Sequence, residues 1–182
     1  MTDLLKREAL RLRFDQEEAD KSSDEWRFNC GPGALCAALK MTPAELRPHM
    51  GDFETKGYTN PTLMLEVLQR LKISHRTMYR SDNPAGTVPE VLHGLLRIQW
   101  GGPWTKPGVP MRVRYRKTHW VALTALSDYV FDVNHSDAWL PYRTWATELI
   151  PWLIRECVPK ADGTWWPTHI ISIQPVENKR TL

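Results

Sequence analysis

The fold of this chain depends on residues 29–39, which run from Asn29 to Leu39 and read NCGPGALCAAL. Glycines on both sides of Pro32 allow a tight turn, and proline is well tolerated in the first turn of a helix, where its missing N–H would have no partner. The run that follows is rich in Ala and Leu, which have high helix propensity. The sequence therefore predicts a helix that begins at or beside Cys30.

Cys30 is the first candidate functional residue. At a helix N-terminus, the unpaired backbone N–H groups and the positive end of the helix dipole favour a thiolate over a thiol. Such a thiolate becomes a nucleophile when a histidine base lies within reach. The alternative is that Cys30 is a small buried hydrophobic side chain. That is what we expect of Cys36, in the middle of the helix, and of Cys157, in an apolar segment near the C-terminus.

The composition indicates one globular domain. The chain has 182 residues, of which 42% are hydrophobic and 25% are charged, and a chain of this size can bury a substantial core. We expect a single domain over residues 1–182, with residues 1–22 as a helical N-terminal extension. The formal net charge of +3 is spread along the chain without a block of Lys and Arg, so nucleic acid is not indicated as a partner.

Cysteine usage and hydropathy indicate a reducing compartment. The three cysteines have no paired spacing, which argues against a disulfide framework and against a Cys-x-x-Cys zinc site. The N-terminus lacks the apolar segment of a signal peptide, and no apolar run approaches the length of a membrane span. We therefore expect a cytoplasmic protein without a membrane partner.

Helix signals dominate the first half of the chain and strand signals the second, which predicts an α+β fold. Capping boxes begin at Thr42 and Thr87, and Asn60 precedes a proline as a further N-cap. The expected helices cover residues 3–19, 30–39, 42–48, 62–71, 91–96 and 145–154.

The expected strands are marked by alternating or continuous apolar side chains. Residues 109–115 alternate like a strand with one exposed face, and the strands over 119–125 and 129–134 are expected to pair as a hairpin. Two further strands are expected over 73–79 and 165–173.

His119 is the preferred candidate base among the six histidines. It opens the apolar strand over 119–125 behind a polar lead-in, so its side chain can emerge at the rim of a sheet. Asp132 or Asn134 on the neighbouring strand can reach the imidazole and fix its tautomer. Two alternatives remain open: a strand-edge histidine without a role, and a zinc site made of Cys30, His119 and Asp132, for which the sequence has no local pair of ligands.

These motifs resemble those of papain-like cysteine peptidases, above all the small bacteriocin-processing (double-glycine leader) type and its relatives in bacterial and phage genomes. The resemblance covers residues 24–175. Its motifs are Cys-Gly-Pro-x-Ala-Leu at the start of a helix, His-Trp-Val-x-Leu on a strand, and a strand that ends Phe-Asp-Val-Asn. The segment from Gly57 to Pro61 is also similar to an entry that these proteins often show. The resemblance implies a papain-like fold, in which the Cys-bearing helix packs on a C-terminal antiparallel sheet.

The resemblance also implies roles for particular residues. Cys30 would be the nucleophile, His119 the general base and acid, and Asp132 its orienting partner, with Asn134 as the alternative for the third role. It implies a peptide or isopeptide bond in a peptide or protein as the substrate, with neither a cofactor nor a metal. If the chain is phage-encoded, a phage or virion protein is a further expected partner, and association with the virion is an alternative location.

The chain departs from the family at the oxyanion donor. The family usually has a glutamine five or six residues before the cysteine, where this sequence has Asp24 and Glu25. An ionised carboxylate cannot donate a hydrogen bond, so Asn29, Gln16 or the Cys30 N–H would have to substitute. This departure supports an alternative, in which a weak or inactive papain-like fold serves as a binding or structural module. A peptidoglycan-amide hydrolase is a third alternative, which would need a cell-wall-binding segment or an export route.

The nine tryptophans are many for this length. Those near turns are expected to pack in the core or against the turns, with a cleft or partner surface as the alternative. They are Trp100, Trp104, Trp139, Trp165 and Trp166.

Overall fold

The computed structural model describes residues 24, 26, 30–79, 93–124, 128–135 and 139–174. The helix expected over 3–19 and the capping box expected at Thr87 lie outside these residues. So do Asn29, Gln16 and Glu25. The described residues combine helices with one antiparallel sheet, which confirms the α+β class.

The sheet has six strands in the spatial order β1-β6-β2-β3-β4-β5, and every neighbouring pair is antiparallel. The expected pairing of β3 with β4 is present. In chain order the strands are β1 (His75–Tyr79), β2 (Gly94–Trp100), β3 (Thr118–Thr124), β4 (Tyr129–Phe131), β5 (Trp139–Pro141) and β6 (Trp165–Ile173).

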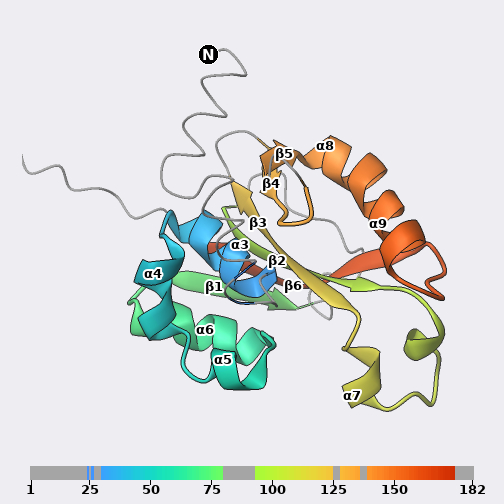
Figure 1. Cartoon of the computed structure of the whole chain (residues 1–182), viewed down its shortest axis with the longest axis horizontal. Coiled ribbons are helices and arrows are strands. Elements are labelled where there is room, and N and C mark those ends of the chain that lie inside the picture. The colour runs from blue at the N-terminus through green and yellow to red at the C-terminus, as the bar shows by residue number, and fades with distance from the viewer. Residues whose placement is uncertain are drawn as a thin grey trace, which may run out of the picture.

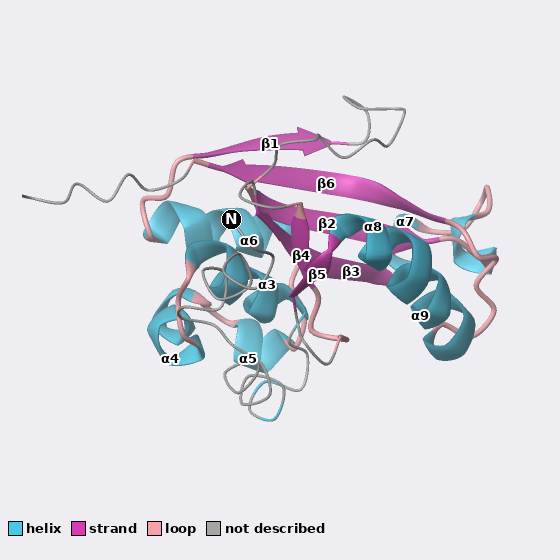
Figure 2. Cartoon of the chain, turned by 90° about the horizontal axis from the view of Figure 1, so that it is seen from above, coloured by secondary structure: helices cyan, strands magenta, loops and turns pink. Residues whose placement is uncertain are grey.

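Helices cover both faces of the sheet, as Figures 1 and 2 show. One face carries α3 (Cys30–Leu39), α4 (Pro43–Leu46), η1 (Arg47–His49), α5 (Phe53–Lys56) and α6 (Pro61–Arg70). The other carries α8 (Tyr142–Thr144), the π-helical segment η4 (Trp145–Leu149) and α9 (Ile150–Cys157). Two short helices, η3 (Pro103–Thr105) and α7 (Met111–Arg114), connect β2 to β3.

Each face of the sheet has its own hydrophobic core. Because side chains alternate along a strand, Leu95 of β2 packs in the core under α3, while Leu96 packs in the core under α9. All of β2 is therefore buried. None of the helices in the described part of the chain is both long and apolar enough to cross a membrane.

Local capping chemistry explains the confirmed helix starts. The Thr42 side chain accepts a hydrogen bond from the Glu45 N–H, and the Glu45 carboxylate accepts one from the Thr42 N–H at 2.8 Å, which is a complete capping box. At α6, the Asn60 Oδ1 accepts a bond of 2.8 Å from the Leu63 N–H. Both starts are set by side chains within three residues, so sequence alone predicts them.

Two predictions about the elements and one about a cysteine are wrong. The expected helix over 91–96 overlaps β2, because a strand buried on both faces reads as a continuous apolar run and mimics a helix. The segment over 109–115, expected to be a strand, contains α7 instead. None of the four residues of α7 is buried, so the alternation of apolar and polar side chains here does not correspond to a sheet with one buried face. Cys157 is exposed at the end of α9, whereas Cys36 is fully buried as expected.

The tryptophans near turns mostly pack inward, as expected. Trp100 and Trp139 are buried, and Trp104 and Trp165 pack partly against the core under α9. Trp166 is the exception, since it lines a pocket on the other face of the sheet.

Candidate active site

Cys30 is the first residue of α3 and is partly buried. The start of α3 lies against the loop before α6, where a Cβ added at Gly31 would overlap the side chain of Thr59. The Thr59 carbonyl in turn accepts a hydrogen bond of 3.3 Å from the indole N–H of Trp120 on β3. Glycine at position 31 therefore lets α3 approach closely enough to bring Cys30 beside the start of β3.

His119 is the second residue of β3, and its side chain is almost completely buried. Its Nε2 atom lies 2.9 Å from Oδ1 of Asp132, and its side chain also hydrogen-bonds with Cys30. Because Asp132 occupies Nε2, Nδ1 is the nitrogen left to face the sulfur. The imidazole stacks on Trp100, with ring centroids 6.1 Å apart and planes 17° apart, which restricts its rotation.

Asp132 follows β4 directly and is inaccessible to solvent. Besides His119, its Oδ1 accepts hydrogen bonds from the Asn134 backbone N–H at 2.9 Å and from Asn134 Nδ2 at 3.0 Å. Its Oδ2 accepts a bond of 2.8 Å from the Trp145 indole. A buried carboxylate is tolerated only when it is paired and hydrogen-bonded, and here both oxygens have donors.

The electrostatics favour an ion pair between thiolate and imidazolium. Burial by itself raises the pKa of the Cys30 thiol, but the hydrogen bond and charge of His119 and the Trp120 backbone N–H outweigh it, so that pKa is lowered. Burial by itself lowers the pKa of His119, yet the charge and hydrogen bond of Asp132, together with Cys30, raise it to about 10. These shifts favour the thiolate form of Cys30 and the protonated form of His119.

Asp132 remains ionised for matching reasons. Its complete burial acts to raise the carboxyl pKa, but the charge and hydrogen bond of His119, with the donors from Asn134 and Trp145, hold that pKa below its usual value. The negative charge needed to support a protonated His119 is thus built into the fold.

Asn134 supports Asp132 in this arrangement. Its Nδ2 lies 3.3 Å from His119 Nε2 and 3.0 Å from Asp132 Oδ1. An amide NH₂ is a donor, and the protonated Nε2 is a donor as well, so these two nitrogens cannot bond to each other in that state. Asp132 is therefore the acceptor that orients His119.

The structure brings together Cys30, His119, Asp132 and Asn134 of the residues singled out from the sequence. Of the residues six and five positions before Cys30, Asp24 is exposed, and Glu25 is outside the described residues.

The sequence does not predict three further residues at this site: Trp100, Trp145 and Arg97. Trp145 offers a weak signal, since a buried indole N–H needs an acceptor, but no spacing links it to Asp132. Arg97 is buried on β2 and interacts electrostatically with Cys30. It lies beside the segment expected to be helical, so its position on the sheet cannot be read from the sequence.

The same geometry bears on the zinc alternative. In the described ranges, no group of three or more His, Cys, Asp and Glu side chains is arranged to hold a metal ion. Comparisons of the chain with protein-family models, with curated proteins and with solved structures found no match.

Proposed function

We propose that this protein is a papain-like cysteine hydrolase that cleaves a peptide or isopeptide bond through Cys30, His119 and Asp132. The observation that supports this most is the continuous hydrogen-bonded chain from the Cys30 sulfur through the His119 ring to the buried carboxylate of Asp132. The residue types, their order and their electrostatics all suit nucleophilic catalysis by a thiolate.

The reaction would use each member of this chain in turn. The Cys30 thiolate attacks the acyl carbon of the scissile bond, and the protonated His119 gives its proton to the leaving amine as the bond breaks. Neutral His119 then takes a proton from water, which attacks the acyl-enzyme and returns the free thiolate and a carboxylic acid. Asp132 keeps the ring oriented and stabilises its charged form throughout.

The oxyanion of the tetrahedral intermediate needs donors as well. The first backbone N–H groups of α3 have no partner within the helix, so the Cys30 N–H suits this role. The exposed carboxylate of Asp24 does not. Since one missing oxyanion donor typically lowers the rate by a factor of about 10² to 10³, we expect a slow enzyme if the backbone acts alone.

The exposed Asp24, at a position where the family has its glutamine donor, favours a second candidate function. In that alternative the fold is a binding or structural module and Cys30 has no chemical role. The two functions differ in how Cys30 reacts, which can be measured before any substrate is known.

The test is the pH dependence of alkylation by iodoacetamide, followed by mass spectrometry of each cysteine. Cys157 is exposed and serves as an internal reference for an ordinary thiol, whereas Cys36 is buried and should stay unlabelled in the native protein. We expect Cys30 to react well below pH 8, and to react faster there than the exposed Cys157. In His119→Ala the advantage of Cys30 should disappear.

If Cys30 is labelled no faster than Cys157 below pH 8, and if its labelling does not depend on His119, the hydrolase proposal fails and the binding module is favoured. If the thiolate is present, a proteome-derived peptide library is the appropriate first screen for cleavage, with Cys30→Ala as the inactive control.

A further inference from the structure

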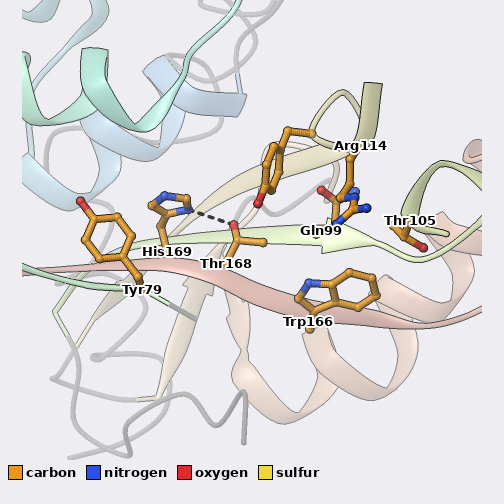
Figure 3. A pocket seen from close by; sticks show the side chains of 8 residues that line it. Tyr79, Gln99, Thr105, Arg114, Trp166, Thr168 and His169 are labelled. Atoms are coloured by element: carbon orange, nitrogen blue, oxygen red, sulfur yellow. Dashed lines mark hydrogen bonds between the residues drawn. The ribbon is translucent and has the colours of Figure 1, made fainter. Parts of the chain in front are cut away.

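A pocket of about 510 Å³ opens on the face of the sheet that carries α3. Its lining residues come from β1, β2, β6, η3 and the segment of α7, and Figure 3 shows Arg114 and Thr105 at the end away from Tyr79 and His169. Its described lining residues are Tyr79, Gln99, Thr105, Arg114, Tyr115, Trp166, Thr168 and His169. None of them belongs to the hydrogen-bonded chain of Cys30, His119 and Asp132.

Strand register connects this pocket to Cys30. Trp120 of β3, whose backbone N–H bonds to the Cys30 sulfur, is paired with Arg97 of β2. Arg97 is paired in turn with His169 of β6, which lines the pocket. Neighbouring strands are about 4.8 Å apart, so the near wall of the pocket is roughly 10 Å from the nucleophile. An extended peptide covers that span in about three residues.

Arg114 lines the pocket and Arg97 lies beside it, close to His169, and no described carboxylate forms an ion pair with either. Arg97 is buried, its Nη2 donates to the neutral oxygens of Thr118 at 3.0 Å and Tyr115 at 3.4 Å, and its Nε has no partner. Arg114 donates at 3.4 Å to the Lys106 carbonyl, and its Nε also has no partner. Among the described lining residues there is no Asp or Glu.

His169 does not add to this charge. Its burial and the positive charge of Arg97 lower its pKa to about 4, so the ring is neutral at pH 7. It contacts the edge of Tyr79, with ring centroids 5.1 Å apart, and its Nδ1 lies 3.2 Å from the Thr168 hydroxyl. The wall nearest to Cys30 is thus aromatic and neutral, and Arg114 lies above the opposite end of the pocket (Figure 3).

Gln99 supplies a fixed hydrogen-bond acceptor in the floor. Its amide nitrogen donates to the Lys117 carbonyl at 2.8 Å and to the Trp100 carbonyl at 3.0 Å, which fixes the orientation of the amide. The side chain is 1% exposed, and its Oε1 has no donor. An unsatisfied buried acceptor is costly, so a ligand N–H that reaches it would be stabilised.

We propose that this pocket binds an acidic residue of the substrate, Asp or Glu, about two or three residues from the scissile bond. The carboxylate pairs with Arg114 in the field of Arg97, and the aromatic walls contact the methylene groups. The backbone N–H of the same residue offers a donor to Gln99. A neutral carboxamide would fit the same volume but would leave the charge of Arg114 unpaired. This inference rests on the proposed peptide hydrolase.

The test measures binding without cleavage, in the Cys30→Ala variant. Two acetylated, amide-capped pentapeptide libraries would be titrated, one with Glu and one with Gln fixed at each position in turn. Binding would be followed by NMR at the Trp166 indole and the His169 ring. We expect the best Glu library to bind about three- to tenfold more tightly than its Gln counterpart, as charge-assisted hydrogen bonds to a half-exposed Arg allow.

Variants on α7 assign this preference to the pocket. Arg114→Gln should remove the preference for Glu, and Arg114→Glu should reverse it in favour of a Lys library. Arg112 is exposed on the same short helix and does not line the pocket, so Arg112→Gln is the matched control and should keep the preference. Equal binding of the Glu and Gln libraries, or a preference that survives Arg114→Gln, would overturn the inference.

The two proposals can fail separately. If Cys30 alkylates like an ordinary thiol while the preference for Glu holds and depends on Arg114, the hydrolase proposal falls and the acidic-peptide site stands. If Cys30 is a reactive thiolate and the libraries bind equally, only the acidic-residue site falls.

Discussion

His119 lies between two partners that differ in their accessibility to solvent. On one side is Cys30, which is partly buried at a helix start, and on the other is Asp132, which solvent does not reach. The carboxylate is further tied to Trp145 and Asn134, so it cannot turn away from the ring. The orientation of His119 therefore depends on Asp132 more than on any other side chain.

Replacing the third member tests that dependence. Asp132→Asn keeps the size of the side chain but removes the charge that raises the pKa of His119, so we expect hydrolysis to fall by about 10²-fold or more. Asn134→Ala removes one donor to Asp132 and should change the rate only a few-fold. Steady-state rates on a peptide from the library screen measure both. A larger loss in Asn134→Ala than in Asp132→Asn would mean that Asn134 is the orienting residue.

The pH profile follows from the two shifted pKa values. Attack needs a deprotonated Cys30. Because the pKa of this thiol is lowered, the rate should rise at a lower pH than the one at which an ordinary thiol loses its proton. Proton donation needs protonated His119, whose pKa is raised to about 10, so the rate should fall above that pH. In Asp132→Asn the descending limb should move to lower pH. A limb that stays in place would show that Asp132 does not set the pKa of His119.

Cys30 can also be separated from a core cysteine by stability. Cys30→Ala removes the nucleophile and should abolish hydrolysis. Because the Cys30 side chain is partly exposed, the same change should alter the free energy of unfolding by less than about 1 kcal/mol. Leu35 lies in the same helix and is fully buried, so Leu35→Ala should cost about 2–5 kcal/mol and serves as the reference. Denaturant unfolding measures both variants. A loss in Cys30→Ala comparable to that in Leu35→Ala would mark Cys30 as a core residue.

At the scale of elements, α3 acts as the support of the site because its first turn lies against Thr59 and β3. Gly31 and Gly33 are both buried in this helix, but they differ in the space around them. A Cβ at Gly31 would overlap the Thr59 side chain, whereas one at Gly33 would lie 3.3 Å from the Phe131 ring. The close approach at Gly31 is what places Cys30 beside Trp120 and His119.

This difference predicts unequal effects of the same substitution. Gly31→Ala should lower the free energy of unfolding by about 1–3 kcal/mol and slow Cys30 alkylation, because the first turn of α3 must move away from Thr59. Gly33→Ala should have a smaller effect on both. Thr59→Gly should restore much of the alkylation rate in the Gly31→Ala background. If the two alanine variants behave alike, the contact with Thr59 does not position the nucleophile.

Which elements the sequence predicts depends on how local their causes are. The starts of α4 and α6 depend on caps such as Thr42 and Asn60, which act within three residues, and both are predicted. The motifs around Cys30 and His119 are short and recognisable, so the members of the candidate site are predicted as well. Burial on both faces of β2 and the contact between Trp145 and Asp132 depend on the assembled sheet, which no short stretch encodes.

At the scale of the whole molecule, the sheet separates two hydrophobic cores, one on each of its faces. β2 and β3 contribute to both cores, since Leu95 and Ala122 face α3 while Leu96 and Val121 face α9. The candidate site depends on both sides, because Cys30 comes from α3 while Asp132 accepts a hydrogen bond from Trp145 of η4 on the opposite face. We therefore expect the two cores to unfold together.

Labelling of Cys36 under native conditions tests this cooperativity. Cys36 is fully buried in the core under α3, so it reacts only when that core opens. Leu95→Ala weakens this core directly and should speed labelling. Leu96→Ala removes a fully buried side chain from the opposite core, with a similar cost of about 2–5 kcal/mol. If β2 couples the cores, Leu96→Ala should speed Cys36 labelling as much as Leu95→Ala does, in proportion to each loss of stability. Labelling that responds to Leu95→Ala alone would mean that the face carrying Cys30 opens independently, and Trp145 would then have no influence on the nucleophile through the fold.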